Sequence, residues 1–269
     1  MQEQRQFWRN KALGLNVMHA THVEYAYPRH SHEEYVVALI EGGVQSFTVK
    51  GTKYVTPPSG LILINPDEIH TGEAVTAHGF KIRSLYPSMA HMQRVGMRNN
   101  DVPYFRNVRE DDREAAHMLH AFHQAIVDEA SELEIESRFL AAMSLLIERY
   151  AEFRPKSPKI GNERSAIHKT RQYIEAHFAQ GVTLNELAEQ AALSPHYLLR
   201  AFCKEVGLPP HAYLQDVRVR HAQRLIEAGE PLSDVAFAVG FSSQSHLTRR
   251  FKQFVGVTPG RYARQIRPN

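Results

Sequence analysis

A group of histidines in the first third of the chain has the composition of a ligand-binding or metal site. His30 and His32 are separated by one residue and followed by two acids, and His70 comes shortly after the turn-forming pair Asn65-Pro66. Residues two apart on a strand point to the same face, so the imidazoles of His30 and His32 can converge, and a neighbouring strand end can add His70. Imidazoles with a carboxylate suit zinc, nickel or iron.

Three interpretations of this group remain open. We favour a polar pocket for a small molecule, with no metal required, over a divalent metal bound by His30, His32 and His70, and a merely structural role is the third. Side chains in the strand and turn after His70 can orient a ligand that carries a carboxylate or hydroxyl. The expected effector-binding residues are His30, His32, Glu34, His70, Glu73, Arg83 and Tyr86.

A second group of candidate functional residues lies near the C-terminus, on two segments that each have one apolar and one polar helical face. Leu198 and Phe202 are four residues apart, as are Leu247 and Phe251, so each pair lies on one buried face. Arg can bind guanine and Gln can bind adenine in the major groove, while hydroxyl groups bind bases or phosphates. The expected DNA-binding residues are His196, Leu199, Arg200 and Lys204 in the first segment and Ser243, Gln244, Ser245, Thr248, Arg249 and Lys252 in the second.

An internal repeat provides the elements that position these polar faces. The pattern Leu184-x-x-Leu187-Ala188 recurs 48 residues later, and the positions from Leu198 to Tyr213 recur after 49. Each copy has a short apolar-faced helix, a turn, a serine (Ser194 or Ser242) able to cap a new helix, and then the polar-faced helix. We therefore predict helix-turn-helix motifs at about 184–205 and 232–254, joined by a helix over 212–228.

The elements around the histidines are of a different kind. From residue 17 to 86, short apolar runs such as 36–40, 45–49, 53–56 and 60–64 end at Gly or Pro turns, which is typical of an antiparallel barrel or sandwich. Beyond Pro103 the apolar period becomes helical, over 111–129 and 133–151. The predicted fold class is a two-domain α+β chain, with an N-terminal antiparallel β-barrel and amphipathic helices before an all-α domain.

Charge and composition agree with this division. The 269 residues carry a formal net charge of only +3, but residues 1–159 contain 18 basic and 20 acidic side chains, whereas residues 160–269 contain 14 and 9. The basic excess in the second part is consistent with a polyanionic partner. The single cysteine, Cys203, cannot form an intrachain disulfide, and the sequence contains neither a signal peptide nor a membrane-spanning stretch, so we expect a cytoplasmic protein.

The run from Gly240 to Tyr262 reads GFSSQSHLTRRFKQFVGVTPGRY and resembles the signature of the AraC/XylS family of transcription regulators. The block from Leu184 to Tyr213 is similar to that family's first helix-turn-helix. The resemblance implies seven helices in two subdomains bridged by a long helix, with base contacts from His196, Leu199 and Arg200 and from Gln244, Ser245, Thr248 and Arg249. Leu199 departs from the family pattern, because an apolar side chain contacts a thymine methyl group at most.

The first part of the chain more loosely resembles a cupin barrel, whose first motif is H-x-H with an acid a few residues later. Here the acids follow His32 directly, so the fourth metal ligand of that pattern is in question. We predict an effector-binding and dimerisation domain over 1–153, a linker over 154–163, and a DNA-binding domain over 164–269.

The resulting hypothesis is a ligand-responsive regulator, more readily an activator, that is not an enzyme. Its partners would be double-stranded promoter DNA, an unidentified small-molecule effector, RNA polymerase and a second copy of the chain, with no membrane. A divalent metal is a possible cofactor, but none is required. The alternative is a metal-dependent cupin dioxygenase or isomerase that uses the histidines and carries a helical appendage.

Overall fold

A computed structural model describes residues 2–11, 13–95, 102–152 and 163–266. The chain divides into two compact units, one formed by Met1–Ala130 with Arg138–Ser157 and the other by Ser131–Ser137 with Pro158–Asn269. Of the linker predicted over 154–163, only Glu163 lies within the described residues. Among the helices described, none is long and apolar enough to cross a membrane.

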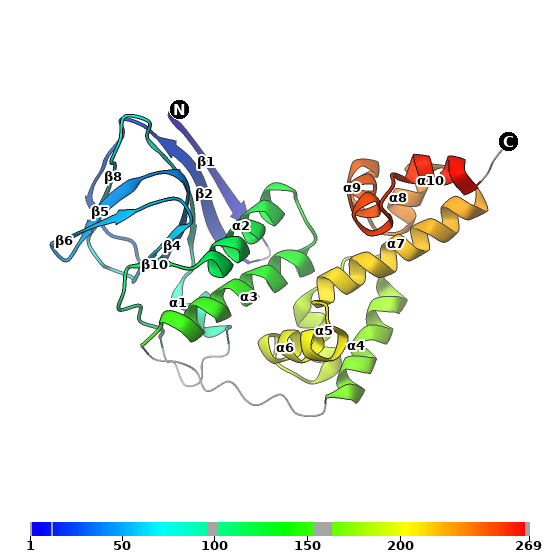
Figure 1. Ribbon diagram of the computed structural model, residues 1–269. Coiled ribbons are helices and arrows are strands. Elements are labelled where there is room, and N and C mark those ends of the chain that lie inside the picture. Colours follow the sequence, from blue (N-terminus) through cyan, green and yellow to red (C-terminus); the bar gives the residue numbers. More distant parts are fainter. Residues whose placement is uncertain (1, 12, 96–101, 153–162, 267–269) are drawn as a thin grey trace. The chain divides into compact units, whose positions relative to one another are not determined.

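The first unit is built on two antiparallel sheets (Figure 1). Its strands are β1 (Gln4–Asn10), β2 (Leu15–His22), β3 (Tyr27–His30), β4 (Val36–Gly43), β5 (Gln45–Val49), β6 (Thr52–Thr56), β7 (Gly60–Ile64), β8 (His70–Ala74), β9 (Phe80–Tyr86) and β10 (Arg109–Asp111). One sheet has the order β1-β2-β9-β4-β7-β10 and the other β3-β8-β5-β6. The four apolar runs predicted as strands are therefore confirmed as β4, β5, β6 and β7.

The register of the larger sheet sorts its side chains onto two faces. Ala38 of β4 lies between Ile62 of β7 and Ser84 of β9. Because successive strand residues point to opposite faces, the even-numbered residues of these strands share one face and the odd-numbered residues share the other. The even face contributes to an apolar core of Val36, Ala38, Ile40, Ile62, Ile64 and Ile82, with Phe47 and Val49 from the second sheet.

Three helices complete this part of the chain. They are α1 (Met89–Gln93), α2 (Arg113–Val127) and α3 (Glu132–Tyr150). Asp112 caps α2 by accepting hydrogen bonds from the backbone N–H groups of Glu114 and Ala115. The buried stripe of α2, which includes Leu119 and Phe122, packs beside β4 and β7. The two predicted amphipathic helices are thus present, and α2 covers the sheet as expected.

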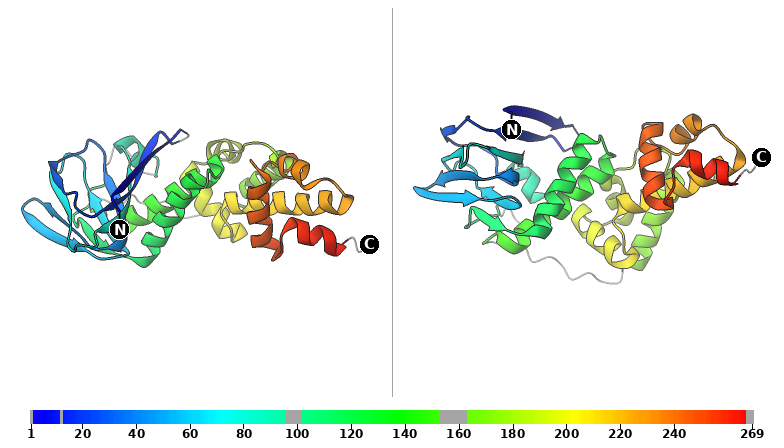
Figure 2. Two further views of the ribbon diagram at one scale, coloured as in Figure 1. Left: turned by 90° about the horizontal axis from the view of Figure 1, so that it is seen from above. Right: turned by 45° about the horizontal axis from the view of Figure 1, so that its top comes forward.

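The second unit contains seven described helices after residue 163. They are α4 (Arg164–His177), α5 (Leu184–Ala191), α6 (Pro195–Val206), α7 (Pro210–Ala228), α8 (Leu232–Ala238), α9 (Gln244–Val255) and α10 (Pro259–Ile266). Helix α7, yellow to orange in Figure 2, joins the subdomain of α4 to α6 to that of α8 to α10. This arrangement confirms the bridged double helix-turn-helix that the repeat and the family resemblance predicted.

Local sequence explains the boundaries of the two polar-faced helices. Ser194 caps α6 and is followed by proline at the first helical position, as predicted. In the second copy the cap is Ser243, whose side chain accepts from the backbone N–H of His246, so the prediction of Ser242 was one residue early. The inner faces bury Leu198 and Phe202 in one motif and Leu247 and Phe251 in the other.

Candidate effector pocket and DNA-binding surface

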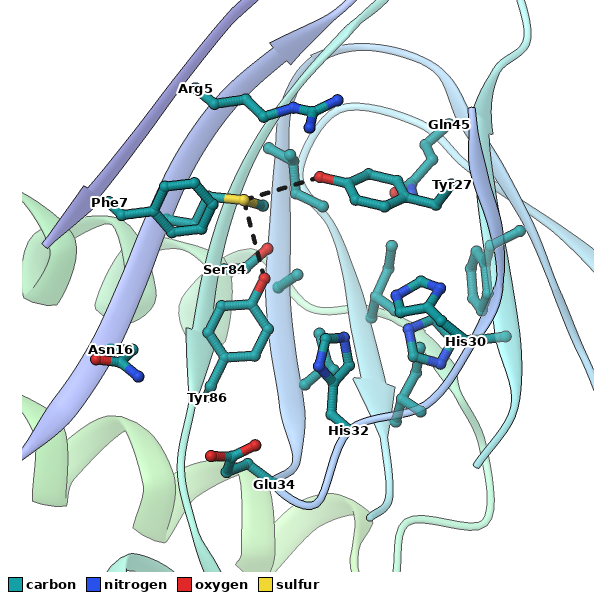
Figure 3. A pocket seen from close by; sticks show the side chains of 18 of the residues that line it. Arg5, Phe7, Asn16, Tyr27, His30, His32, Glu34, Gln45, Ser84 and Tyr86 are labelled. Atoms are coloured by element: carbon teal, nitrogen blue, oxygen red, sulfur yellow. Dashed lines mark hydrogen bonds between the residues drawn. The ribbon is translucent and has the colours of Figure 1, made fainter. Parts of the chain in front are cut away.

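A cavity of about 780 Å³ lies between the two sheets of the first unit (Figure 3). Both sheets contribute to its wall, and its lining combines apolar with polar side chains. The apolar part includes Met18, Val36, Ala38, Phe47, Ile62, Ile64 and Ile82, and the polar part includes Arg5, Asn16, Tyr27, His30, His32, Glu34, Gln45, His70, Ser84 and Tyr86. This volume and mixture are typical of a small-molecule site.

The three predicted histidines converge in the wall of this cavity. Strand β3 ends at His30 and pairs with β8 exactly where β8 begins, so that His30 lies opposite His70. The ring centroids are 4.2 Å apart for His30 and His70, 4.9 Å for His30 and His32, and 5.3 Å for His32 and His70. Each ring offers a nitrogen, and these nitrogens lie within 4.8 Å of one another.

Backbone contacts orient two of the rings. The Nδ1 atom of His30 lies 2.8 Å from the carbonyl oxygen of Pro28, and the Nδ1 atom of His70 lies 2.8 Å from that of Glu68. A carbonyl only accepts, so each Nδ1 carries the proton and leaves Nε2 with its lone pair. Burial lowers the pKa of His70 to about 4 and also lowers the pKa of His32, which keeps both rings neutral at pH 7.

Two tyrosines and a methionine form another part of the wall. The hydroxyl groups of Tyr27 and Tyr86 both lie close to the sulfur of Met18, at 3.8 Å and 3.9 Å, as the dashed lines in Figure 3 mark. Burial raises the pKa of Tyr86 to about 12, so the phenol is neutral. The guanidinium of Arg5 lies 3.7 Å from the ring centroid of Tyr25, and it adds a cation to the lining.

Two predicted effector residues lie outside the cavity. Arg83 is an odd-numbered residue of β9, so it points to the opposite face from Ser84 and forms an ion pair with Glu41 at 2.5 Å. Glu73 is about half exposed and pairs with Lys53 at 2.9 Å. Glu34 does line the cavity, but among the described residues no carboxylate joins the three-histidine group. The expectations for Arg83 and Glu73 were therefore wrong.

The sequence analysis missed the contribution of β1. This strand lies at the edge of the larger sheet and supplies Arg5, Phe7, Trp8 and Arg9 to the cavity lining. The strands predicted from the sequence begin only at residue 17, after this segment. The neighbouring aromatic residues Phe7 and Trp8, which favour strands, were the available signal.

The second helix-turn-helix presents a polar surface on α9. Gln244, Ser245, Arg249 and Lys252 are exposed along this helix, while Leu247 and Phe251 are fully buried. Thr248 donates its hydroxyl to the carbonyl oxygen of Gln244, 2.9 Å away, which leaves the hydroxyl oxygen as an acceptor. The side chain of Ser243 caps the helix. The polar face predicted on α9 is therefore exposed, and Ser243 has a structural role as the helix cap.

The first helix-turn-helix differs from expectation at two positions. His196 and Leu199 were predicted on the outer face of α6, but each is only 5% exposed. Burial lowers the pKa of His196 to about 4, and Arg200 lowers it further. Leu199 joins Leu198, Ala201 and Phe202 in a wide apolar stripe, as its side chain favours. Arg200 is half-buried and Lys204 is exposed, so this helix displays fewer polar groups than α9.

Arg218 and Cys203 are two further side chains of this unit whose surroundings indicate a structural role. Arg218 of α7 is 4% exposed and donates hydrogen bonds to the carbonyl oxygens of Phe178 and Gln180, at 2.7 Å and 2.9 Å. It therefore ties α7 to the end of α4. Cys203 is half-buried, and burial raises the pKa of its thiol, which is the opposite of what a reactive thiolate needs.

Comparison with known families gives matches to both parts of the chain. Residues 13–143 match the family described as AraC-like ligand binding domain, and residues 187–265 match a family described as helix-turn-helix domain. The uncharacterized HTH-type transcriptional regulator YbfI of Bacillus subtilis is 31% identical over 82% of this chain and 81% of its own length. The HTH-type transcriptional activator RhaS of Klebsiella pneumoniae is 23% identical, over 87% of this chain and 86% of RhaS.

Solved structures are similar to the chain as well. ToxT from Vibrio cholerae aligns with 95% of this chain and 99% of its own, at 13% identity and a TM-score of 0.38. The C-terminal domain of AraT from Geobacillus stearothermophilus covers 40% of this chain and 88% of its own, at 31% identity and a TM-score of 0.36.

Proposed function

Because the chain belongs to the AraC family of transcription regulators, we propose that it reads promoter DNA mainly through α9 and adjusts this binding when a small molecule occupies the cavity. The observation that carries the proposal is that the cavity lies inside the domain that matches a ligand-binding family, with walls from both sheets. The family assignment favours a regulator over the metal-dependent enzyme that the histidines had also suggested.

The DNA contacts follow from the exposed chemistry of α9. Arg249 and Gln244 have the donors and acceptors that distinguish guanine and adenine in the major groove. Lys204 and Lys252, exposed at the ends of α6 and α9, suit phosphate contacts. Since Leu199 and His196 are buried, we expect the half-site of α6 to be less sequence-specific than the half-site of α9.

The lining of the cavity defines the effector class. Aliphatic and aromatic side chains cover much of the wall, whereas imidazole, phenol, amide and guanidinium groups supply donors. A ligand that satisfies both has an apolar body and a carboxylate or hydroxyl group. Its binding would favour one of two states of the protein, and promoter affinity would change by the ratio of its affinities for those states.

The remaining partners are part of the same proposal. We propose that the regulator acts in the cytoplasm as a homodimer and that it activates transcription, as the name of its relative RhaS, a transcriptional activator, suggests. We further propose that it does so through contact with RNA polymerase. No prosthetic group is required for the DNA-binding step.

Fluorescence anisotropy with the full chain tests the DNA proposal. Fragments of the DNA flanking its own coding region would be compared with scrambled fragments across a salt series. We expect one fragment to bind at least a hundredfold more tightly, and affinity to fall linearly with salt on logarithmic axes. Equal affinity for all fragments would reject sequence-specific binding.

The effector proposal needs a separate measurement. Thermal unfolding of the full chain would be followed with sugars, amino acids and aromatic acids, since a ligand that prefers the folded state raises the midpoint. A true effector must also change the affinity for the promoter fragment. Compounds that raise the midpoint without changing DNA affinity would contradict a regulatory role for the cavity.

A further inference from the structure

We propose that His30, His32 and His70 bind one Zn²⁺ ion whose fourth coordination position faces the cavity, where an anionic oxygen of the effector would bind. The three rings come from two strands and the loop after β3, and they meet in the cavity wall (Figure 3). The proposed effector site is thereby given a specific chemical anchor. The metal site itself does not depend on the effector, and only the role of the fourth position rests on the proposed function.

The spacing of the ligand atoms fits a tetrahedral ion. Zinc binds imidazole nitrogen at about 2.0–2.1 Å, so two nitrogens on one zinc ion lie roughly 3.4 Å apart. The three imidazoles offer nitrogens within 4.8 Å of one another before any ion is present. Movement of each ring by about an ångström therefore completes the site without a change in the strand register.

Hydrogen bonds of the surrounding backbone prepare the rings for a metal. His30 and His70 each use Nδ1 on a carbonyl oxygen, of Pro28 and Glu68, and each keeps Nε2 available. Metal-binding histidines commonly donate their second ring N–H in this way, which fixes the tautomer and raises the basicity of the ligand.

The donor set favours zinc over iron. Non-haem Fe(II) sites typically combine two histidines with one carboxylate, and within the described residues no carboxylate joins this group. Three neutral imidazoles match the ligand set of zinc sites that keep one open position. Glu34, Tyr86 and Arg5 also line the cavity, so a ligand on the fourth position would meet further polar groups.

Titration calorimetry of chelator-treated full chain without a polyhistidine tag tests the site. We expect one Zn²⁺ per chain with a Kd in the micromolar range or tighter, and His32→Gln should weaken binding at least tenfold. His32 is the variant of choice because it is only half-buried. His117→Gln, at an exposed position on α2, is the matched control and should bind Zn²⁺ as the unmodified chain does.

A thermal midpoint without metal shows whether His32→Gln is folded, and His30→Gln provides a second ligand variant if it is not. Absence of saturable Zn²⁺ binding, or equal binding by the unmodified chain and folded ligand variants, overturns the site. These measurements contain no DNA, so they can fail while the regulator proposal stands, and the reverse also holds.

The open position has its own readout. Co²⁺ substituted for Zn²⁺ gives a visible spectrum that responds to its ligands, and acetohydroxamate is a small oxygen chelator that can occupy a free position. We expect acetohydroxamate to change the visible spectrum of the Co²⁺-loaded chain. It should change the spectrum of the Co²⁺-loaded His117→Gln control in the same way. An unchanged spectrum in a chain that binds Co²⁺ stoichiometrically would reject the cavity-facing position.

Discussion

Arg249 occupies one exposed position of α9, directly after Thr248 and two residues beyond the buried Leu247, and we propose that it reads a base from there. Its planar guanidinium can donate two parallel hydrogen bonds to guanine, which no other side chain on this face can do. We predict that Arg249→Ala weakens binding to the promoter fragment by about 1–3 kcal/mol and relaxes specificity at one base pair. A selection from randomised fragments would identify that base pair.

Arg224→Ala is the control for the loss of positive charge. Arg224 is exposed on α7 and lies outside both polar-faced helices. Its removal should lower affinity for all fragments alike, with a smaller salt dependence, and leave the base preference intact. A base preference that survives Arg249→Ala would remove Arg249 from its assigned role.

A pair of histidines on the helix-facing side of the larger sheet predicts acid sensitivity. His19 of β2 and His123 of α2 share a hydrogen bond of 3.0 Å, and Arg83 lies 3.2 Å from the same nitrogen of His19. Burial, followed by the charge of Arg83, lowers the pKa of His19 to about 4, and burial also lowers the pKa of His123 well below its ordinary value. Glu41, which pairs with Arg83 and His120, opposes the shift only partly.

The sign follows from proton binding. An unfolded chain binds a proton at a histidine near pH 6.5, whereas the folded chain does so at His19 only near pH 4. Stability is therefore full above about pH 6.5 and falls as the pH drops from there to about 4, and the loss due to His19 reaches about 2 kcal/mol by pH 5. Urea unfolding at pH 7.5 and 5 measures this loss. His19→Gln should reduce it, and the exposed His117→Gln should not.

For single residues, the sequence predicted which side chains could bind a ligand better than it predicted the direction in which each side chain points. The convergence of His30 and His70 could be anticipated, because the end of a neighbouring strand can place His70 beside His30. The third ring, His32, joins them from the loop after β3 and not from the strand itself. The error at Arg83 arose from strand alternation, since Arg83 is adjacent in sequence to the cavity-lining Ser84 and therefore points to the opposite face. A shift of one position reverses the face, and no local feature of the sequence distinguishes the two registers.

Among the elements, the turn inside each helix-turn-helix shows how the two copies diverged. Ala192 ends α5 with φ +54°, and Gly240, 48 residues later, has φ +84°. A side chain at Gly240 would place Cβ 2.7 Å from the carbonyl oxygen of Ala179. We predict that Gly240→Ala destabilises the chain by about 3 kcal/mol, because left-handed strain adds to this overlap, whereas Ala192→Gly stabilises it by up to about 1 kcal/mol.

Gly207→Ala separates the strain of a positive φ from the overlap with Ala179. Gly207 also has a positive φ, but no atom lies within 4 Å of the added Cβ. It should cost about 1 kcal/mol in urea unfolding. Equal effects of Gly240→Ala and Gly207→Ala would show that the contact with Ala179 has no energetic weight.

The helices were predictable and one strand was not, for a physical reason. Apolar residues at three- and four-residue spacing mark α2, α3 and the repeat directly, because each helix needs one buried stripe. Strand β1 pairs only with β2 and exposes Phe7 at 66%, so its sequence lacks the alternation of a half-buried strand. Its place in the fold depends on antiparallel pairing with β2, the next strand of the chain, and the pattern of its own residues does not record that pairing.

For the whole molecule, the bridged pair of helix-turn-helix motifs predicts the layout of the DNA site. Recognition helices that enter successive major grooves on one side require half-sites about 10 base pairs apart, roughly 34 Å. Insertion of 5 base pairs between the half-sites should therefore reduce affinity at least tenfold. Insertion of 10 should not restore it, because the second half-site returns to the same side of the DNA but lies about 34 Å farther away, whereas the single helix α7 keeps the two motifs at a fixed spacing. Anisotropy on the three fragments measures this, and equal affinity for all three would contradict simultaneous engagement.

Because even- and odd-numbered residues of the larger sheet lie on different faces, mutations at the two sets of positions have different effects, which matters for evolution and protein engineering. Substitutions at Val36, Ala38, Ile62, Ile64, Ile82 and Ser84 alter the cavity wall, whereas their odd-numbered neighbours face away from it. New inducer preferences can therefore arise by point mutation at one set of positions, while the other set keeps the support of α2. A combinatorial library confined to the even set would sample biosensors of altered selectivity on an unchanged scaffold.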